Sequence, residues 1–590
     1  MTQCPLRLAP PTAEPDTMSE TLHDASGFTA WNPGLETRIP REFRGLETIC
    51  RPECAFSTPE LLDELGAMTG LPPEELAELR PERLALHELI VRITADIAVE
   101  EGASEENFGQ NFRAIAHQIL GDHITPNMDA INGIYADLQR DAGERVRTIL
   151  DTALGRRVTE QAEPRSFMSR LFRKPPPPPD RHESAPEREH RVIAGFKATG
   201  LAATDPLERA VFKSLYRVLG SIATKRTTLG ANLDMLGRLV TQHVCNTYGS
   251  QLIGRTIAPM IDAAIAQQGY TRVLNRAAPV LISLKGASAA GKSSIRPMIK
   301  RVMRESGIES DGYATISPDV WRRLLLDYES LGPARKYAGH LTSREVMVID
   351  GKLDRYISDK ARQAQAIPHL LVDRFRFDSF SSKEIARVLH ETYTRYVSTI
   401  HMYFIVTPPE ETVERGWQRA LERGRYKAVE DFLGHCVEAY SGMPRMLFKW
   451  LAHQPIDYRY YFLDNLVPKG TFPTPIAFGN RREMTIYDAS RLVDIGRYEH
   501  INIHARSRAE VYPDDYRVDI ARDTAFLRNC LRRIPLVTFR DGRNGPPYLE
   551  FRHGTPVLLD AAVVNRLTIN PYFAAILREI APKLDTTAPC

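Results

Sequence analysis

The chain has 590 residues, 43% of them hydrophobic and 26% charged, and its formal net charge is +3 at pH 7. These values are ordinary for a soluble globular protein of three or four domains, and the net charge by itself favours no class of partner. The sequence contains no uninterrupted apolar run long enough to cross a bilayer, which excludes a transmembrane helix.

The first segment, residues 1–50, is polar and rich in Pro, Thr and Glu, so we predict that it is disordered. It has no apolar core of the signal-peptide type, which favours a cytoplasmic location. Export as an effector, through a signal read by a dedicated bacterial machine, stays open as an alternative. The seven cysteines are scattered, and Cys50 and Cys54 in "CRPEC" have no second Cys or His pair at metal-ligand spacing. We therefore expect free, reduced thiols.

Two helical regions precede any catalytic motif. Residues 51–160 are predicted to form a helical domain, whose first helix has Thr58 as its N-cap. Residues 161–192 form a Pro-rich linker with five consecutive prolines at 175–179, and residues 193–277 form a second helical segment. The apolar and basic stretch before the prolines is either solvated linker or a contact for a membrane or partner. The helical regions are candidate binding surfaces for a protein partner.

The stretch "VLISLKGASAAGKSSIRPMIKRV", residues 280–302, combines a buried strand, a loop of small residues and an amphipathic helix. The loop fits G-x-x-x-x-G-K-[ST], in which backbone N–H groups and the helix N-terminus surround a polyphosphate. Lys292 is expected to reach the β- and γ-phosphates of ATP, and the Ser293 hydroxyl to bind Mg²⁺. The alternative is an unrelated Gly/Ala turn. The predicted nucleotide-binding residues of this loop are Gly286, Ala287, Ser288, Ala289, Ala290, Gly291, Lys292, Ser293 and Ser294.

The remaining chain alternates strands and helices, which predicts an α/β fold with the parallel sheet core of a P-loop NTPase over residues 278–505. The expected strands after the first are "YATIS", "HLLVD", "STIHMYFIV" and "YRYYFLDN". Asp464 and Asn465 are expected at the ligand edge of the sheet, and the loop that follows is a candidate contact for the nucleotide base. Residues 506–590 form a small mixed region with the strand-like pieces "IPLVTF", "PYLEF" and "TPVLL".

Two aspartates follow predicted strands at the edge where parallel sheets bind ligands. Asp319 comes just after the second strand and can accept the proton of an attacking hydroxyl, while Ser317 or Asp319 can also cap the next helix. Asp373 ends the third strand and is expected to coordinate or orient Mg²⁺, or else to pair with a neighbouring arginine.

Two further helices have candidate roles. The helix that begins at "TSREV" has a predicted capping box of Thr342 and Glu345, and His340, Thr342 and Ser343 are candidate substrate contacts. After the fourth strand, Thr407 is a predicted cap and the two prolines that follow it suit a first turn. The basic residues of this second helix predict a lid that stabilises the transferring phosphate, or a merely solvated face: Arg415, Arg419, Arg423 and Arg425.

Over residues 280–480 the chain resembles the zeta toxin family of small P-loop kinases. The resemblance rests on "GASAAGKSS", "ISPDVWRR", "TSREV", "HLLVD" and "VERGWQRALERGR". It implies that Lys292 binds ATP phosphates, that Asp319 is the general base, and that Arg415 and Arg425 act on the phosphates. Asp373 takes the place of the family's strand-end acid, although "VDRF" replaces the usual Glu-Gly and the lid is shorter. Family members phosphorylate a sugar hydroxyl of a nucleotide sugar.

Three functions are compatible with these residues. The first is a Mg·ATP-dependent kinase that phosphorylates a hydroxyl of a small metabolite, such as a nucleotide sugar or another nucleotide. The second is a nucleotide-binding switch or scaffold with slow hydrolysis. The third is a kinase for the 5′ end of a nucleic acid. The sequence pI of about 8.4 is only mildly basic, and the one candidate segment is 540–554, so nucleic acid is not the expected partner.

Overall fold

The computed structural model describes residues 27–102, 105–155, 184–305, 307–308, 312–374, 394–452, 456–512 and 519–584. The chain separates into two compact units, Arg41–Leu89 with Gln118–Gln267, and Met1–Pro40 with Ile90–His117 and Gln268–Cys590. We call them the helical unit and the sheet unit. The predicted apolar and basic stretch, the five prolines and most of the predicted linker lie outside the described residues. The predicted domain boundaries stay predictions. The disorder predicted for residues 1–50 is wrong for the described part, 27–50, because contacts with the rest of the chain order it, such as the hydrogen bond from Trp31 to Glu414.

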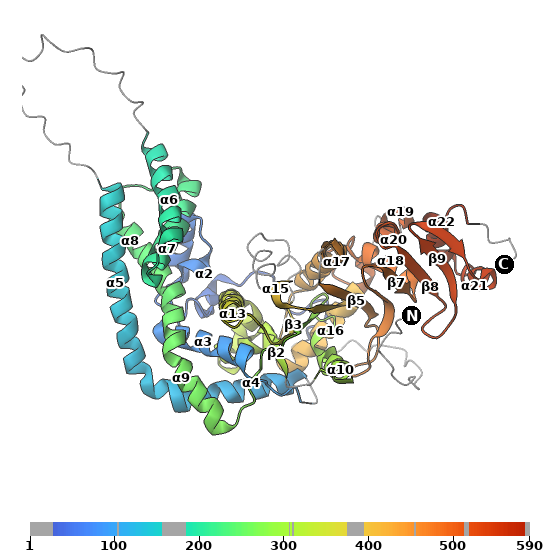
Figure 1. The fold of residues 1–590 in the computed structure, drawn as a ribbon, viewed down its shortest axis with the longest axis horizontal. Helices are drawn as coiled ribbons and strands as arrows, with labels where there is room; N and C mark the ends of the chain where they lie inside the picture. Colours follow the sequence, from blue (N-terminus) through green and yellow to red (C-terminus); the bar gives the residue numbers. More distant parts are fainter. Residues whose placement is uncertain are drawn as a thin grey trace, which may run out of the picture. The chain divides into compact units, whose positions relative to one another are not determined.

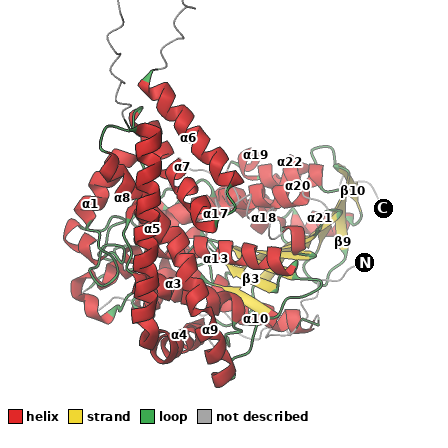
Figure 2. Ribbon diagram, turned by 60° about the vertical axis from the view of Figure 1, so that its left-hand side comes forward, coloured by secondary structure: helices red, strands yellow, loops and turns green. Residues whose placement is uncertain are grey.

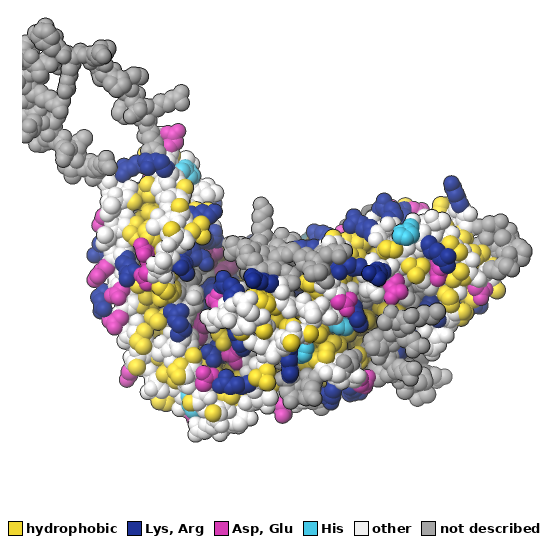
Figure 3. Space-filling view, in the orientation of Figure 1, with side chains coloured by type: hydrophobic (Ala, Val, Ile, Leu, Met, Phe, Trp, Pro, Cys, Tyr) yellow, Lys and Arg dark blue, Asp and Glu magenta, His cyan; other side chains and the backbone are white. Residues whose placement is uncertain are grey.

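The helical unit consists of helices, drawn in red in Figure 2, that pack around one apolar core. The predicted cap of its first long helix is confirmed, since Thr58 Oγ1 accepts a hydrogen bond from the Leu61 amide at 3.3 Å. On its surface, cationic and anionic side chains are interspersed (Figure 3). Its elements are η1 (Arg41–Leu46), α1 (Pro59–Thr69), α2 (Pro73–Leu76), the first part of α3 (Pro81–Asp96), η2 (Leu120–Ile124), η3 (Thr125–Asn127), α5 (Met128–Leu154), α6 (Ala185–Ala202), α7 (Pro206–Arg226), α8 (Leu233–Val244), η5 (Cys245–Gly249) and α9 (Ser250–Gln268).

The sheet unit is built on a ten-stranded sheet with the order β10-β9-β8-β7-β6-β5-β4-β1-β3-β2 (Figure 1). Its five predicted P-loop strands are confirmed, and all four pairings among them are parallel. The α/β class with a parallel core is therefore confirmed. These strands are β1 (Val280–Lys285), β2 (Tyr313–Ile316), β3 (His369–Asp373), β4 (Thr399–Val406) and β5 (Asp457–Asp464).

Strand β1 is buried along its whole length and lies between β3 and β4. Its β-branched and leucine side chains suit a strand that is covered on both faces. Rings pair across β4 and β5, with Phe404 and Phe462 centroids 4.7 Å apart and Tyr403 and Tyr461 centroids 4.6 Å apart. This central part of the sheet fixes the strand ends that surround the loop of residues 286–293, which we call the phosphate loop.

The sheet continues beyond β5 with mixed pairing. Strand β6 (Thr474–Gly479) lies in the segment after Asn465 that the sequence predicted to be a loop, so the loop prediction is wrong for 474–479. Strand β7 (Glu483–Ile486) lies where the sequence predicted no element. The three predicted C-terminal strands are confirmed as β8 (Leu536–Arg540), β9 (Pro547–Arg552) and β10 (Thr555–Leu558). Because β8 pairs with β7, they extend the same sheet.

The helices of the sheet unit follow the expected alternation with strands. They are the second part of α3, α4 (Glu105–Ile119), α10 (Lys292–Glu305), η7 (Pro318–Trp321), α11 (Arg322–Leu325), η8 (Glu329–Tyr337), α12 (Ala338–Leu341), α13 (Ser343–Ala364), α15 (Thr394–Tyr396), α16 (Pro409–Arg423), α17 (Val429–Ala452), α18 (Ala489–Tyr498), η11 (Arg508–Glu510), α19 (Ile520–Asp523), α20 (Ala525–Arg533), α21 (Ala561–Leu567) and α22 (Pro571–Ile580).

Among the described residues, three predicted helix caps are wrong. Thr342 precedes α13 but has φ −101° and ψ −7°, and its hydroxyl donates back to the Ala338 and Gly339 carbonyls instead of capping. Neither Ser317 nor Asp319 caps a helix by its side chain, and the Ser317 hydroxyl accepts from an arginine instead. The residue before α16 is Pro408, while the Thr407 hydroxyl donates to the phosphate loop.

The described cysteines are free, as expected, and the structure places all of them in buried positions: Cys50, Cys54, Cys245, Cys436 and Cys530. Within the described ranges, no helix has both the length and the apolar character needed to cross a membrane.

Candidate active site

The phosphate loop between β1 and α10 is crowded by the ends of the neighbouring strands. Ala289 has φ +60° and Gly291 has φ +89°, the left-handed region that favours residues with little or no side chain. A Cβ on Gly291 would overlap Nδ2 of Asn465, and a Cβ on Gly286 would lie 2.9 Å from the Ile405 carbonyl oxygen. Small residues are therefore required here by the neighbours of the loop as well as by a ligand.

Two polar side chains fix the loop to the ends of β4 and β5. The Thr407 hydroxyl and the Asn465 amide both donate to the carbonyl of Ala290, at 3.2 and 2.7 Å. The Asn465 carbonyl in turn accepts a hydrogen bond of 2.8 Å from Arg415 on α16. Asn465 therefore connects the loop to the predicted lid, and its predicted place at the ligand edge is confirmed.

Lys292 begins α10 and lies over the loop. Its Nζ donates to the carbonyls of Gly286 and Ala287 at 3.1 and 2.9 Å. Burial lowers the pKa of Lys292, while the charges of Asp373 and Asp319 oppose that effect. An ammonium has three donors, so Lys292 can keep two loop contacts and still donate to a phosphate oxygen.

Ser293 and Asp373 meet at the end of β3. The Ser293 hydroxyl donates to Oδ2 of Asp373 at 2.7 Å, and the Asp373 side chain is 4% exposed. A hydroxyl and a carboxylate are oxygen ligands of the kind Mg²⁺ prefers. Across the described ranges, no group of three or more His, Cys, Asp and Glu could hold a metal ion. A Mg²⁺ here would therefore take most of its ligands from phosphates and water, as Mg²⁺ commonly does.

Asp319 lies in η7, after β2, and contacts two arginines. Its carboxylate is 2.5 Å from Nη2 of Arg425 and 3.1 Å from Nε of Arg322. Loss of water around this carboxyl would raise its pKa, but the charges of Arg425 and Arg322 outweigh that effect and hold the pKa of Asp319 well below its usual range. Asp319 is therefore ionised throughout the physiological range of pH.

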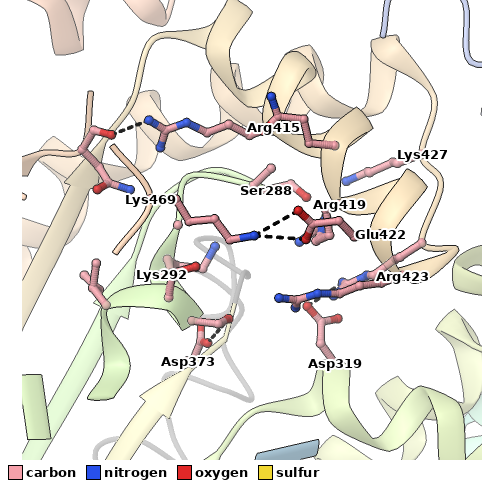
Figure 4. Close-up of a pocket in the computed structure, with 18 of the residues that line it drawn as sticks. Ser288, Lys292, Asp319, Asp373, Arg415, Arg419, Glu422, Arg423, Lys427 and Lys469 are labelled. Atoms are coloured by element: carbon pink, nitrogen blue, oxygen red, sulfur yellow. Dashed lines mark hydrogen bonds and ion pairs between the residues drawn. The ribbon is translucent and has the colours of Figure 1, made fainter. Parts of the chain in front are cut away.

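Helix α16 brings the predicted lid arginines to the same place. Figure 4 shows Arg419 and Arg423 on α16 with Asp319, Asp373 and Lys292 nearby. The helix ends at Gly424, which has φ +64°, and Arg425 follows directly. Lys469 pairs with Glu422 of the same helix at 3.0 Å, and both are exposed.

These elements surround one cavity of about 490 Å³. Most predicted site residues line it: Ser288, Ala289, Gly291, Lys292, Ser293, Ser294, Asp319, Asp373, Arg415, Arg419 and Arg425. The other three loop residues, Gly286, Ala287 and Ala290, are buried beneath the loop surface. His340 and Ser343 line the cavity, whereas Thr342 is buried. Of the described residues that line the cavity, none comes from 540–554.

Several residues that line the cavity were not predicted from the sequence. Lys427 Nζ lies 2.5 Å from Nδ1 of His435, and the His340 ring lies 3.0 Å from Asp431. Burial lowers the pKa of Lys427 to about 7, and burial together with the Lys427 charge lowers the pKa of His435 to about 2. Lys427, Asp431 and His435 belong to no motif, and only the fold brings them to the cavity beside His340, which was a predicted substrate contact. Arg322 and Tyr426 were missed as well, whereas Asn465 and the loop after it were expected near the site and line the cavity: Val467, Pro468, Lys469, Gly470 and Thr471.

Comparison with known proteins gives one family. Residues 264–446 match the model of the family described as zeta toxin. No protein with a curated description matches the chain. Among solved structures, the chain is similar to one from the PezAT chromosomal toxin–antitoxin system of Streptococcus pneumoniae, at 16% identity over 35% of this chain and 77% of that chain, with a TM-score of 0.24. The resemblance to the zeta toxin family that the motifs predicted is confirmed, for residues 264–446.

Proposed function

We propose that the chain is an ATP-dependent kinase that transfers the γ-phosphoryl group to a hydroxyl of a small metabolite. The observation that supports this most strongly is that Lys292, the Ser293–Asp373 pair and Asp319 with Arg425 line one cavity. A phosphate loop, a site for Mg²⁺, a carboxylate base and cations for the transferring group are the parts that phosphoryl transfer requires. The match to the zeta toxin family supports the same reading.

Each side chain has a role in this proposal. The loop amides and the N-terminus of α10 hold the phosphates, together with Lys292. Ser293 and Asp373 hold Mg²⁺, which neutralises charge on the phosphate oxygens when it is bound. The acceptor oxygen forms a bond to the γ-phosphorus, the bond from that phosphorus to the bridging oxygen breaks, and ADP leaves. The hydroxyl proton passes to the Asp319 carboxylate.

The arginines act on the transferring group, and one must first leave Asp319. Arg425 pairs with Asp319 and lines the cavity beside Arg415 and Arg419. The phosphates of ATP compete for Arg425, because they carry more negative charge than one carboxylate. As Arg425 turns toward the phosphates, the pKa of Asp319 rises and the carboxylate becomes a better proton acceptor. Binding of ATP thus prepares the base.

The acceptor is proposed to occupy the part of the cavity beyond Asp319. Among the cavity residues that have no role toward ATP in this proposal, Arg322, His340, Ser343, Lys427 and His435 are all polar or charged, and we propose that they contact the acceptor. Such groups suit a hydroxylated, polar metabolite, and the family resemblance favours a nucleotide sugar or another nucleotide. A protein partner for the helical regions and a cytoplasmic location stay predictions.

A second function is supported by the same ion pair. A carboxylate held by two arginines is a weak proton acceptor, as a nucleotide-binding switch with slow hydrolysis would require. In that case Asp319 anchors the lid, and the helical unit responds to the bound nucleotide. The switch needs Lys292 for binding and needs no acceptor.

The test compares the parent protein with Lys292→Met and, as a control, Lys583→Met, which changes an exposed lysine. Each is incubated with Mg·ATP and a metabolite extract, and metabolites that gain one phosphoryl group are identified by mass spectrometry. The kinase proposal predicts a new phosphorylated species with the parent and the control, and none with Lys292→Met. ATP binding by the parent with no modified metabolite would favour the switch.

A further inference from the structure

Arg296, one turn into α10 from Lys292, is completely buried with its charge. Its Nη1 donates to the Ser317 hydroxyl at 3.2 Å and lies 3.7 Å from Oδ2 of Asp373. Ser317 begins the turn that contains Asp319, and Asp373 is the partner of Ser293. One guanidinium therefore contacts both the proposed Mg²⁺ carboxylate and the turn that holds the proposed base.

The counter-charge for Arg296 comes from far away in the sequence. Glu101, between α3 and α4, accepts a hydrogen bond from Arg296 Nε at 2.8 Å and lies 2.9 Å from Nζ of Lys300. Phe108 on α4 lies against the guanidinium, 4.5 Å from ring centroid to Cζ. Glu101 and Phe108 both precede residues 264–446, the zeta toxin-like segment. That segment thus receives part of the support for its phosphate loop helix from outside itself.

Charge balance explains why Glu101 matters. Arg296 and Lys300 bring two positive charges to the buried side of α10, and Glu101 and Asp373 bring two negative charges. Without Glu101, Arg296 would keep Asp373, 3.7 Å away, as an ion-pair partner. Arg296 would then shift toward Asp373 and compete with Mg²⁺ for it, because removing one partner of a buried pair leaves an uncompensated charge.

We propose that Arg296 is a positioning residue for Asp373 and for the Ser317–Asp319 turn, and that Glu101 holds Arg296 in place. This inference rests on the proposed function in one respect, namely that Mg·ATP is the ligand of the cavity. The first consequence is that the zeta toxin-like segment alone lacks a complete Mg²⁺ site. The second is that Glu101 and Arg296 act on Mg²⁺-dependent binding without contacting ATP.

A purely structural ion pair makes a different prediction. If Arg296 only stabilises the fold, its loss weakens ATP binding equally with and without Mg²⁺. If Arg296 orients Asp373, the loss of Arg296 weakens ATP binding mainly in the presence of Mg²⁺. Residues behind metal ligands typically change metal affinity by about 10–100-fold. The ratio of the ATP dissociation constants without and with Mg²⁺ separates the two cases.

The experiment measures this ratio by calorimetry for the full-length parent, Glu101→Gln, Arg296→Lys and Arg296→Met, with folding checked by circular dichroism. Lys360→Met is the matched control. Lys360 Nζ donates to Asp96 at 2.7 Å, so this variant also breaks a partly buried contact to the segment before α4 but leaves Arg296 intact. Glu101→Gln and Arg296→Met are expected to reduce the ratio about 10-fold, and Lys360→Met to preserve it.

The outcomes separate the inference from the proposed function. A parent that binds no ATP overturns both. The inference alone is overturned if the parent binds ATP more tightly with Mg²⁺ and the ratio of dissociation constants is the same in Glu101→Gln and Arg296→Lys as in the parent. An equal fall of this ratio in Lys360→Met also overturns the inference, because the effect would then come from a general loss of packing against the segment before α4. If Arg296→Met does not fold, Glu101→Gln and Arg296→Lys give the decision, since both keep the volume of the buried side chains close to that of the parent.

Discussion

Nη2 of Arg425 lies 2.5 Å from Oδ2 of Asp319, and this contact joins the end of the lid helix to the turn after β2. In the proposed function, Arg425 has two alternative partners in one cavity, the Asp319 carboxylate and the phosphates of ATP. The low pKa of Asp319 follows from this contact and from Arg322. In the proposed function, the ionisation of Asp319 is thus tied to the position of the residues that end α16.

The first prediction concerns the pH dependence of turnover. The depressed pKa of Asp319 keeps it ionised, so the parent should lose no activity through Asp319 as the pH falls to mildly acid values. Arg322→Met removes a cation 3.1 Å from the carboxylate, which raises the pKa of Asp319. The rate of the variant should therefore fall at a higher pH than that of the parent. A pH profile of kcat/KM measures the shift.

Arg362→Met is the control for this profile, because Arg362 is an exposed arginine on α13 that pairs with Asp359. Its acid limb should coincide with that of the parent. An Arg322→Met profile that also coincides with the parent would show that Asp319 does not titrate as the catalytic group.

The second prediction concerns Gly291. Gly291→Ala places a Cβ onto Nδ2 of Asn465 and forces an alanine into φ +89°. We expect ATP binding to weaken by at least about 10-fold, because strain of about 1–3 kcal/mol would displace the loop amides. Calorimetric titration with ATP measures the loss. Gly351→Ala, in the middle of α13 with nothing within 4 Å of the added Cβ, should bind ATP like the parent.

The third prediction concerns the N-terminal contact with the lid helix. Trp31 Nε1 donates to Oε1 of Glu414 on α16 at 2.7 Å, and Lys336 Nζ donates to the Pro33 carbonyl at 3.0 Å. Trp31→Phe removes the first bond and should cost about 1 kcal/mol, which makes opening of α16 about five times more frequent. Amide hydrogen exchange over Pro409–Arg423 measures the change.

Lys469→Ala is the comparison for Trp31→Phe. It breaks the exposed pair between Lys469, in the loop after β5, and Glu422 of α16, and exposed pairs contribute little to stability. Exchange in α16 should be nearly unchanged. Equal exchange in all three proteins would mean that the segment before Pro40 does not stabilise the lid.

The fourth prediction concerns Lys285, the last residue of β1. Burial, helped by the charges of Arg374 and Lys292, lowers its pKa from 10.5 to about 7. Between these two values the unfolded chain binds a proton that the folded chain releases, so the free energy of unfolding rises with pH. The slope for one proton is at most about 1.4 kcal/mol per pH unit.

Lys285→Met removes this proton and should flatten the rise of stability above about pH 7, as measured by urea unfolding across that range. Lys583→Met, at an exposed position, should keep the slope of the parent. A slope that is the same with and without Lys285 would contradict a neutral buried lysine in β1.

Local patterns were sufficient to predict the five parallel strands and much of the cavity. Short apolar runs bounded by Gly and Pro are strong strand signals, and parallel strands bring their carboxyl ends to one edge. For this reason Ser293, Asp319 and Asp373, which lie at or after the ends of three different strands, were expected together and do line one cavity. The arginines of α16 were expected there because the helix follows β4.

The remaining features depend on contacts between distant parts of the chain. The Thr342 capping box fits the sequence pattern, yet the preceding turn of α12 supplies carbonyls that take the hydroxyl instead. Strand β6 is short and rich in Gly and Pro, and pairing with β5 decides its conformation. Glu101 and Arg296 are 195 positions apart, and no periodicity or motif relates them.

The central claim is that the cavity transfers a phosphoryl group and does more than bind nucleotide. The most direct measurement compares parent and Asp319→Asn for two quantities, the affinity for ATP and the rate at which a metabolite extract gains phosphate. We predict that Asp319→Asn binds ATP within about 3-fold of the parent and transfers phosphate about 10²–10⁴ times more slowly. Equal rates of transfer in the two proteins would contradict the account, and so would a parent that binds ATP and modifies no metabolite.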